Sequence, residues 1–313
     1  MSGDRSRIEC CYFSLPAPPG PGAERLARAE AGGARLSLDL SGRVVVSQTD
    51  GNRVYAHAAL QELEVAEAVR LRDQGDMYER LARVLHYTAQ AHCPDWSVLV
   101  ERLDEKKLER YEPASGNQSH VWNTWKLDWW RRRIIDAPDG ARVLLIDGDT
   151  FITRALDDAW SLDFDVAITM RHRHLTKPPG ISGGIPFNAG VIFLRVTDRT
   201  RAFMESWWRA NLRFLGSQAE HEPWRKRYAG INQAALGYLL EQAQHGCEVR
   251  ELPCVEWNCC EWALYDPEVT RIVHVKSGLR RVTFQRPGAA SNPRLQELAK
   301  LWRRIEQQSK EER

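Results

Sequence analysis

The sequence predicts one α/β domain, built on a mostly parallel β-sheet that is flanked by helices. Short apolar runs typical of buried strands alternate with longer runs of helical spacing, which is the pattern of parallel sheets. The chain has 313 residues, 43% of them hydrophobic, which is enough for one large core. No linker rich in Pro, Gly or Ser divides its middle, so we expect a single domain over residues 34–290.

The N-terminal third combines an irregular segment, a hairpin and a long helix. Residues 1–33 contain a proline- and glycine-rich run that suits neither a helix nor a central strand, so we expect them to be irregular or disordered. Two apolar runs, 36–40 and 43–47, flank a glycine and predict two strands or a hairpin. Helical spacing then covers 55–91, with a predicted break near Gly75.

The middle of the chain contains the clearest strands. Residues 142–146 are wholly apolar, which is typical of a strand buried between helices. Residues 164–169 and 189–195 predict two further strands, and 96–101 a short earlier one. The segment 119–135 has helical spacing.

The C-terminal third is predicted to be mainly helical. Residues 200–214 and 231–244 predict two helices, and 271–275 a short last strand. The segment 291–313 is charged and predicts a terminal helix over 293–308.

The composition excludes some classes of protein and names no partner. There are 44 basic and 42 acidic residues, so the net charge of +2 indicates no particular ligand. The seven cysteines show neither a CxxC pair nor a zinc-ligand spacing, and free thiols favour a reducing compartment. No apolar stretch is long enough to span a bilayer and no signal core is present. We therefore expect a cytoplasmic protein.

Two carboxylates follow the buried strand 142–146. Asp147 and Asp149 flank a glycine at the carboxyl end of this strand, where ligands bind in open α/β sheets. Carboxylate oxygens are ligands for Mg²⁺ and Mn²⁺, which commonly bridge a protein to phosphate. A D-x-D pair also occurs as a simple turn at a strand end, so the pair alone is weak.

Several segments, in order, resemble one enzyme family. The order and spacing resemble the retaining nucleotide-sugar glycosyltransferases typified by glycogenin and the bacterial lipooligosaccharide galactosyltransferases, which have the Rossmann-like GT-A fold. The resemblance implies a hexosyltransferase that takes its sugar from a nucleotide-diphosphate donor, with UDP the expected nucleotide. The segments that carry it are 143–152, 187–195, 230–236, 255–258 and 272–276.

The resemblance implies a metal site and its ligands. Asp147 and Asp149 would hold the metal ion, and His274 would be the third protein ligand. A ligand set of carboxylates and an imidazole favours Mn²⁺, with Mg²⁺ as the alternative. His274 could instead be a histidine whose hydrogen bonds are satisfied within a strand.

The resemblance also implies residues that bind the donor. Thr49, Asp50 and Tyr55, after the strand 43–47, would hold the base and ribose. Lys126 matches a basic residue on the helix before the D-x-D pair, and Lys276 would contact the diphosphate. The donor-sugar pocket would be lined by Asn188, Ala189 and Gly190.

The sequence departs from the family at two places. The family usually has Asp before Gln where this chain has Asn232 and Gln233, and an amide cannot be a carboxylate nucleophile. We expect these two residues to be catalytic in a front-face displacement with retention, in which the leaving phosphate deprotonates the acceptor. Inversion would need a base, for which Glu256, Glu261 and Asp266 are the candidates.

The second departure lies after His274, where the family's usual Gly and Lys-Pro-Trp are missing. Arg280 and Arg281 are therefore the alternatives to Lys276 as the phosphate contact.

Other functions remain open at this point. A haloacid-dehalogenase-type phosphatase also has a D-x-D strand end, but it needs Thr or Val where this chain has Phe151. A non-catalytic nucleotide-sugar-binding protein would keep the same fold. The acceptor is expected to be a glycan or lipid-linked saccharide. The basic runs 131–133 and 171–177 also permit DNA with a hydroxymethylated base, which would have to flip out, and a protein hydroxyl is a third option.

Overall fold

A computed structural model describes most of the chain, in two compact units. The described residues are 6–13, 35–38, 44–47, 53–55, 59–103, 111–171, 186–242, 245–285 and 292–311. One unit comprises Met1–Tyr12 and Leu81–Arg313, and the other Phe13–Arg80.

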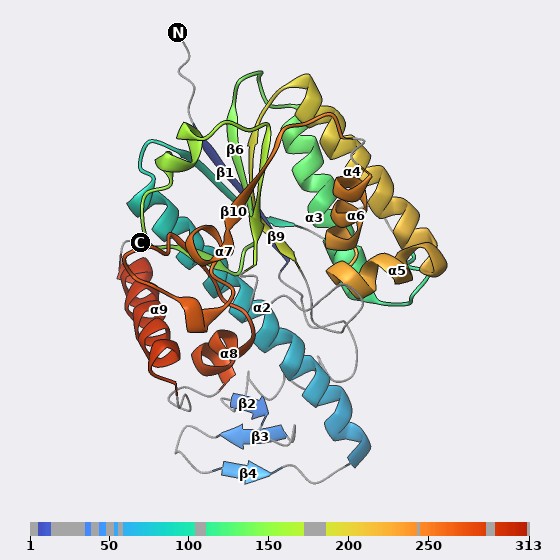
Figure 1. The fold of residues 1–313 in the computed structure, drawn as a ribbon. Helices are drawn as coiled ribbons and strands as arrows, with labels where there is room; N and C mark the ends of the chain where they lie inside the picture. The colour runs from blue at the N-terminus through green and yellow to red at the C-terminus, as the bar shows by residue number, and fades with distance from the viewer. Residues whose placement is uncertain are drawn as a thin grey trace. The chain divides into compact units, whose positions relative to one another are not determined.

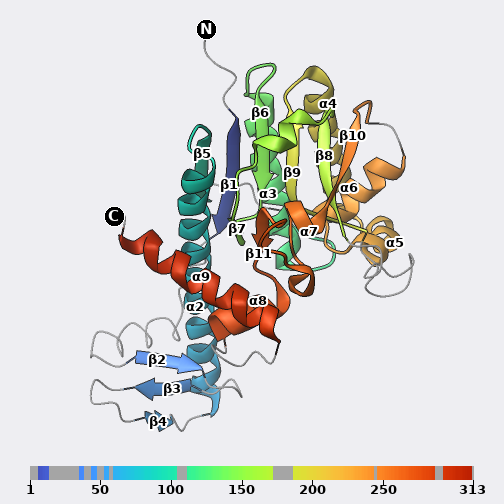
Figure 2. The same ribbon diagram turned by 60° about the vertical axis from the view of Figure 1, so that its left-hand side comes forward.

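The larger unit is organised around a six-stranded sheet. Figure 2 shows its strands side by side in the order β10-β8-β9-β6-β1-β5. β10 is parallel to β8 and β1 is parallel to β6, while β9 is antiparallel to both of its neighbours. The expected mostly parallel sheet is therefore confirmed. The bounds are β1 (Arg7–Phe13), β5 (Ser97–Leu103), β6 (Arg142–Ile146), β8 (Val166–Met170), β9 (Phe187–Arg195) and β10 (Val249–Pro253).

β1 corrects the expectation that residues 1–33 are irregular. It pairs with the central strand β6, with Ile8 opposite Leu144. Local sequence hides this strand because Glu9 is charged yet only 3% exposed. Arg133 of the helix α3 (Gln118–Ile135) binds the Glu9 carboxylate at 3.1 Å, which compensates part of the cost of burying that charge.

Helices cover one face of the sheet. β6 alternates, so that Val143 and Leu145 face one hydrophobic cluster while Leu144 and Ile146 face the other. The first cluster is closed by α3 (Gln118–Ile135), α4 (Asp198–Gly216) and α6 (Asn232–Glu241), which lie together on one side of the sheet (Figure 1). Predicted helices at all three places are confirmed.

The other face is covered by more varied elements. Leu85 and Ala89 of α2 (Ala59–His92) and Trp257 of α7 (Cys254–Trp257) pack in its cluster. The predicted strand near 271–275 is confirmed as β11 (Ile272–His274), but it pairs antiparallel with β7 (Thr150–Ile152) in a separate two-stranded sheet.

The smaller unit contains a three-stranded antiparallel sheet. β2 (Arg35–Leu38) and β3 (Val44–Ser47) pair as the predicted hairpin, and β4 (Arg53–Tyr55) adds a third strand. The predicted break near Gly75 is wrong, because α2 is continuous there. One glycine costs a helix only about 1 kcal/mol, which a helix of 34 residues tolerates.

The remaining elements lie between these or follow them. No helix among the described residues is both long and apolar enough to cross a bilayer. The predicted terminal helix is α9 (Pro293–Glu311). The other elements are the 3₁₀ turns Asp157–Ser161 and Trp262–Leu264, α5 (Gln218–Tyr228), α8 (Ser277–Arg280) and a π-helical turn, Arg281–Gln285.

Candidate functional site

The candidate site lies where the carboxyl end of β6 meets the amino end of β9. These strands are antiparallel and pair Ile146 with Val191. One step further on, the Asp147 backbone N–H donates to the Gly190 carbonyl at 2.8 Å. The D-x-D pair and the Asn-Ala-Gly segment are therefore neighbours in space.

A third element brings His274 to the two carboxylates. β11 pairs with β7 so that His274 lies opposite Thr150, the residue after Asp149. The ligand atoms of Asp147, Asp149 and His274 lie within 4.8 Å of one another, close enough to bind one ion. The structure thus brings together the three residues that the resemblance implied.

Hydrogen bonds fix the orientation of the His274 ring. Asn258 donates from Nδ2 to Thr169 Oγ1 at 2.9 Å and to Asn188 Oδ1 at 3.0 Å, so its Oδ1 must be the acceptor facing His274. His274 Nδ1 lies 2.9 Å from that oxygen and therefore carries a proton.

This orientation leaves Nε2 of His274 facing a carboxylate. Nε2 lies 2.9 Å from Asp149 Oδ1. Burial lowers the pKa of His274, which favours the neutral ring, with a lone pair on Nε2. Two acceptors then face each other, an arrangement that a cation between them would stabilise. The donor set fits a metal ion.

Each carboxylate also has a cationic partner. Lys126 Nζ lies 2.5 Å from Asp147 Oδ1, and Arg280 contacts Asp149 Oδ2. Burial alone would raise the pKa of Asp149, but the neighbouring cations Arg280 and Lys276 hold it well below its usual range. Burial would likewise lower the pKa of Lys126, but the pairing with Asp147 raises it. Both side chains stay charged.

Only glycine fits at position 190. A Cβ there would lie 2.5 Å from His274 Cε1 and 2.7 Å from both Asp147 Oδ2 and Asn188 Oδ1. The ring, the carboxylate and the amide therefore converge on the space beside this backbone.

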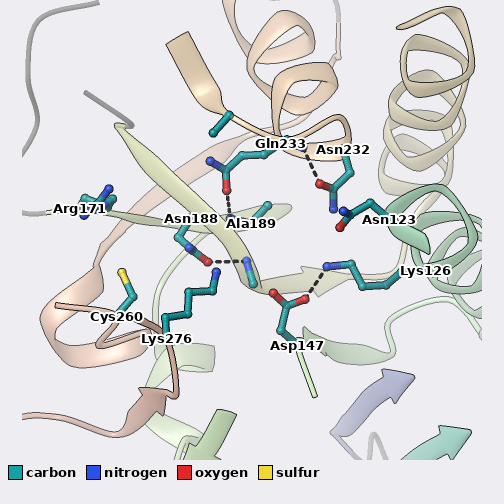
Figure 3. A pocket seen from close by; sticks show the side chains of 13 residues that line it. Asn123, Lys126, Asp147, Arg171, Asn188, Ala189, Asn232, Gln233, Cys260 and Lys276 are labelled. Carbon is teal, nitrogen blue, oxygen red and sulfur yellow. Dashed lines mark hydrogen bonds and ion pairs between the residues drawn. The ribbon is translucent and has the colours of Figure 1, made fainter. Parts of the chain in front are cut away.

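A polar cavity of about 300 Å³ opens from this cluster. In Figure 3, Arg171, Cys260 and Lys276 enter from one side, and Asn123 and Lys126 from the opposite side. The cavity is lined by Asn123, Lys126, Asp147, Arg171, Asn188, Ala189, Gly190, Ala229, Gly230, Asn232, Gln233, Cys260 and Lys276.

The expected catalytic amides lie at the start of α6 and border the cavity. Gln233 accepts a hydrogen bond from the Ala189 backbone N–H at 3.1 Å and donates to the Tyr228 carbonyl. Asn232 is 6% exposed, and its Oδ1 accepts from the Gln233 N–H at 2.8 Å. Each amide is thus held by backbone.

Three expected donor-binding residues are not brought to the cavity by any described part of the chain. Thr49 and Asp50 lie outside the described residues, and so does the side chain of Tyr55, which ends β4. The strand before them, β3, belongs to the three-stranded antiparallel sheet, whereas β1 is the strand that lies beside β6.

Sequence reasoning gave no role to several residues of the site. Asn258 is the last residue of a quoted motif, and its fixed distance from His274 was the only available signal. Cys260 and Asn123 gave none, because their convergence depends on tertiary contacts, and Arg171 was named only as part of the basic run 171–177.

Most of the charged candidates named from sequence prove to be paired. Glu261 binds Arg171 at 2.6 Å, and Glu256 binds Arg271 at 3.0 Å. The basic run 131–133 is neutralised within the molecule by Asp128, Glu205 and Glu9. The loop 172–185 lies outside the described residues.

Neither protein-family models nor curated proteins match the chain. Among solved structures, it is similar to a glycosyltransferase involved in the glycosylation of the major capsid of PBCV-1, at 15% identity and a TM-score of 0.40, over 63% of this chain and 89% of that one. It is also similar to the glycosyltransferase GlyE of Streptococcus pneumoniae TIGR4, at 14% identity and a TM-score of 0.44, over 74% of this chain and 61% of that one. A third similar structure is the galactosyltransferase LgtC in complex with donor and acceptor sugar analogs, at 16% identity and a TM-score of 0.38, over 74% of this chain and 97% of that one.

Proposed function

We propose that this protein is a metal-dependent glycosyltransferase of the GT-A type, which moves a sugar from a UDP-sugar to a hydroxyl acceptor with retention. The observation that carries the proposal is the convergence of Asp147, Asp149 and His274 at one end of a polar cavity. The ordered motifs that place these residues in the sequence support the same enzyme class.

The proposed metal ion is Mn²⁺, with Mg²⁺ as the alternative. Two carboxylates and the Nε2 lone pair of His274 would hold it, and a mixed oxygen and nitrogen set favours Mn²⁺. When bound, such an ion neutralises the charge that develops on a diphosphate leaving group. Asn258 holds the imidazole in the tautomer that this role requires.

Lys276 is suited to bind the donor diphosphate. It lines the cavity and makes no ion pair within the described ranges, whereas Lys126 and Arg171 are each bound to a carboxylate. A cation without an internal partner beside a metal site favours an anionic ligand. We therefore keep Lys276 as the phosphate contact, and assign Arg280, which contacts Asp149, a supporting role.

The amides and the small residues are proposed to hold the sugar. Asn188 and Gln233 are fixed by hydrogen bonds to backbone, so their remaining hydrogen-bonding capacity faces the cavity. The small side chain of Ala189, which lines the cavity, lets a ligand approach the backbone closely.

The charges around the cavity support retention. Among the described residues that line it, Asp147 is the only carboxylate, and it is paired with Lys126. An inverting mechanism needs a free base opposite the leaving group, and a double displacement needs a carboxylate nucleophile. A front-face displacement needs neither, because the leaving phosphate takes the proton of the acceptor. Asn232 and Gln233 would then position the sugar during the displacement.

We propose a glycan or lipid-linked saccharide as the acceptor. The described arginines of the run 131–133 bind carboxylates of this chain, which weakens the case for a DNA acceptor.

The experiment that tests the function measures nucleotide release from a panel of nucleotide sugars with Mn²⁺, with and without EDTA. Metal-dependent release from one donor, lost in Asp149→Asn, is the expected result. Binding of UDP and Mn²⁺ with no turnover, even with simple sugars and hydroxymethylated DNA as acceptors, would favour a non-catalytic nucleotide-sugar-binding protein.

A further inference from the structure

One of the seven cysteines differs from the other six. All seven are free, and six are buried, whereas Cys260 is partly exposed and lines the cavity. Figure 3 shows its sulfur beside Arg171 and Lys276, on the side of the cavity opposite Lys126. A reagent that enters the cavity therefore meets one thiol.

The backbone before Cys260 is anchored. Cys259 donates its N–H to the Ile272 carbonyl at 2.8 Å and accepts from the His274 N–H at 3.0 Å, on either side of β11. Cys259 itself is buried, and Cys260 follows it directly toward the cavity. The position of Cys260 is thus set by the same strand that carries His274.

The groups around Cys260 favour its thiolate form. The Cys254 thiol hydrogen-bonds to it, and Lys276 and Arg171 add positive charge, while burial and Glu261 oppose them. Glu261 is itself bound to Arg171 at 2.6 Å, which weakens its repulsion. The net effect lowers the pKa of Cys260 to about 7.

The other cysteines stay protonated. Burial raises the pKa of Cys93 and of Cys259 to about 12, and the hydrogen bond to Cys260, together with burial, raises that of Cys254 still further. Thiolate character and access therefore coincide at one position, and thiolates are the reactive form of cysteine.

We propose that Cys260 is a covalent modification site for small anionic electrophiles, placed in the cavity wall between Arg171 and Lys276 and supported by the thiol of Cys254. Iodoacetate serves as the probe. The Cys260 sulfur attacks its CH₂ carbon, an S–C bond forms, and the C–I bond breaks as iodide leaves. The thiolate form releases no proton in this step.

Charge selectivity distinguishes this site from an ordinary exposed thiol. An isolated thiolate repels an anionic reagent, whereas Lys276, which has no ion-pair partner in the described part of the chain, attracts one. The ratio of iodoacetate to iodoacetamide rates should therefore be higher at Cys260 than for a small free thiol at the same pH.

The test is peptide mapping by mass spectrometry after brief treatment of the native full chain. We expect Cys260 to be labelled at least about tenfold faster than any other cysteine, since one unit of pKa changes the thiolate fraction tenfold. Cys254→Ala should slow labelling by about that factor, and Cys254→Ser, which keeps a hydrogen-bond donor, should restore most of it. Lys276→Gln should lower the iodoacetate rate more than the iodoacetamide rate.

Two results would overturn the proposal: labelling of Cys260 no faster than that of the buried cysteines, or a wild-type rate ratio equal to that of the free thiol. Circular dichroism of each variant guards against misfolding.

The consequence of the modification rests on the proposed function, because an adduct at Cys260 would occupy space meant for the donor. Whether UDP with Mn²⁺ slows the labelling of Cys260 tests this overlap with the donor separately. Selective labelling without protection would keep the thiolate site and count against the proposed donor cavity; protection without charge selectivity would do the reverse.

Discussion

The two ends of the cavity differ in how completely their charges are paired. At the carboxylate end, where Asp147 lines the cavity and lies close to Asp149 and His274, each of these side chains has a partner within the fold. At the cysteine wall, formed by Arg171, Cys260 and Lys276, Lys276 makes no ion pair among the residues that the structure describes. The first end is organised in advance for a cation, and the second retains charge for an anion. A nucleotide-sugar bound to a metal ion needs both.

The largest expected effect comes from breaking the carboxylate end. Asp149→Asn removes the negative charge that faces His274 Nε2 and pairs with Arg280, so we expect donor turnover to fall by roughly a thousandfold, in the range seen when a group that stabilises charge in a transition state is lost. Nucleotide release at saturating Mn²⁺ measures it. Asp158→Asn, a change at an exposed carboxylate, is the control, and near-wild-type turnover in Asp149→Asn would remove the metal role.

The space between the two ends is tested next. Gly190→Ala puts a methyl group into the ring of His274 and the carboxylate of Asp147. We expect about 1–3 kcal/mol of lost stability from the forced shifts, and at least tenfold weaker Mn²⁺ binding. Thermal unfolding measures the loss of stability, and a metal titration measures the affinity for Mn²⁺. Gly216→Ala, at a site where a Cβ meets nothing within 4 Å, is the matched control.

His274→Ala sharpens the comparison by removing one ligand and leaving both carboxylates. Loss of an imidazole ligand should weaken Mn²⁺ binding by about 10- to 100-fold, and activity should recover as Mn²⁺ is raised. Titrating activity against Mn²⁺ distinguishes a metal-binding role of His274 from a structural one. An equal loss at saturating metal would mean that the histidine is purely structural.

The cysteine wall should respond more mildly. Lys276→Gln removes one unpaired charge, and we expect KM for the donor to rise roughly tenfold with little change in kcat, as for a contact made equally in the ground and transition states. Steady-state kinetics check this. A large fall in kcat at unchanged KM would mean that Lys276 acts on the leaving group during the displacement.

The smallest expected effect concerns two buried histidines, His221 of α5 and His120 of α3. His221 contacts the Gly230 carbonyl at 3.0 Å, and its ring lies 5.1 Å from that of His120. Burial lowers the pKa of both. The two histidines are therefore protonated more readily in the unfolded chain than in the folded one. The free energy of unfolding should fall as the pH drops below about 6.5. Thermal unfolding from pH 7.5 to 5.5 tests this, and His120→Asn should flatten the profile.

Prediction from sequence succeeded where structure is local. The strand 142–146 has the predicted bounds, because a fully apolar run before D-x-D leaves little choice. The helices α3 and α4 followed from spacing alone.

Prediction from sequence failed where the structure of a segment depends on contacts with residues far along the chain. β1 was missed because its buried Glu9 is compensated by Arg133, far along the chain. The places of Asn258 and Cys260 in the site could not be predicted, because they depend on the pairing of β11 with β7. His274 was found because its motif is recognisable, and the nucleotide-binding role expected of Thr49 and Asp50 stays a prediction, since both lie outside the described residues.

The late arrival of His274 has a consequence during biosynthesis. His274 lies 125 residues after Asp149. At the usual pace of translation, about 5–20 residues per second, roughly 6–25 s separate their emergence from the ribosome. A nascent chain can therefore begin to collapse with its two carboxylates exposed and without its imidazole ligand. The proposed metal binding through all three residues must therefore wait until β11 docks, which would make it a late marker of a finished fold.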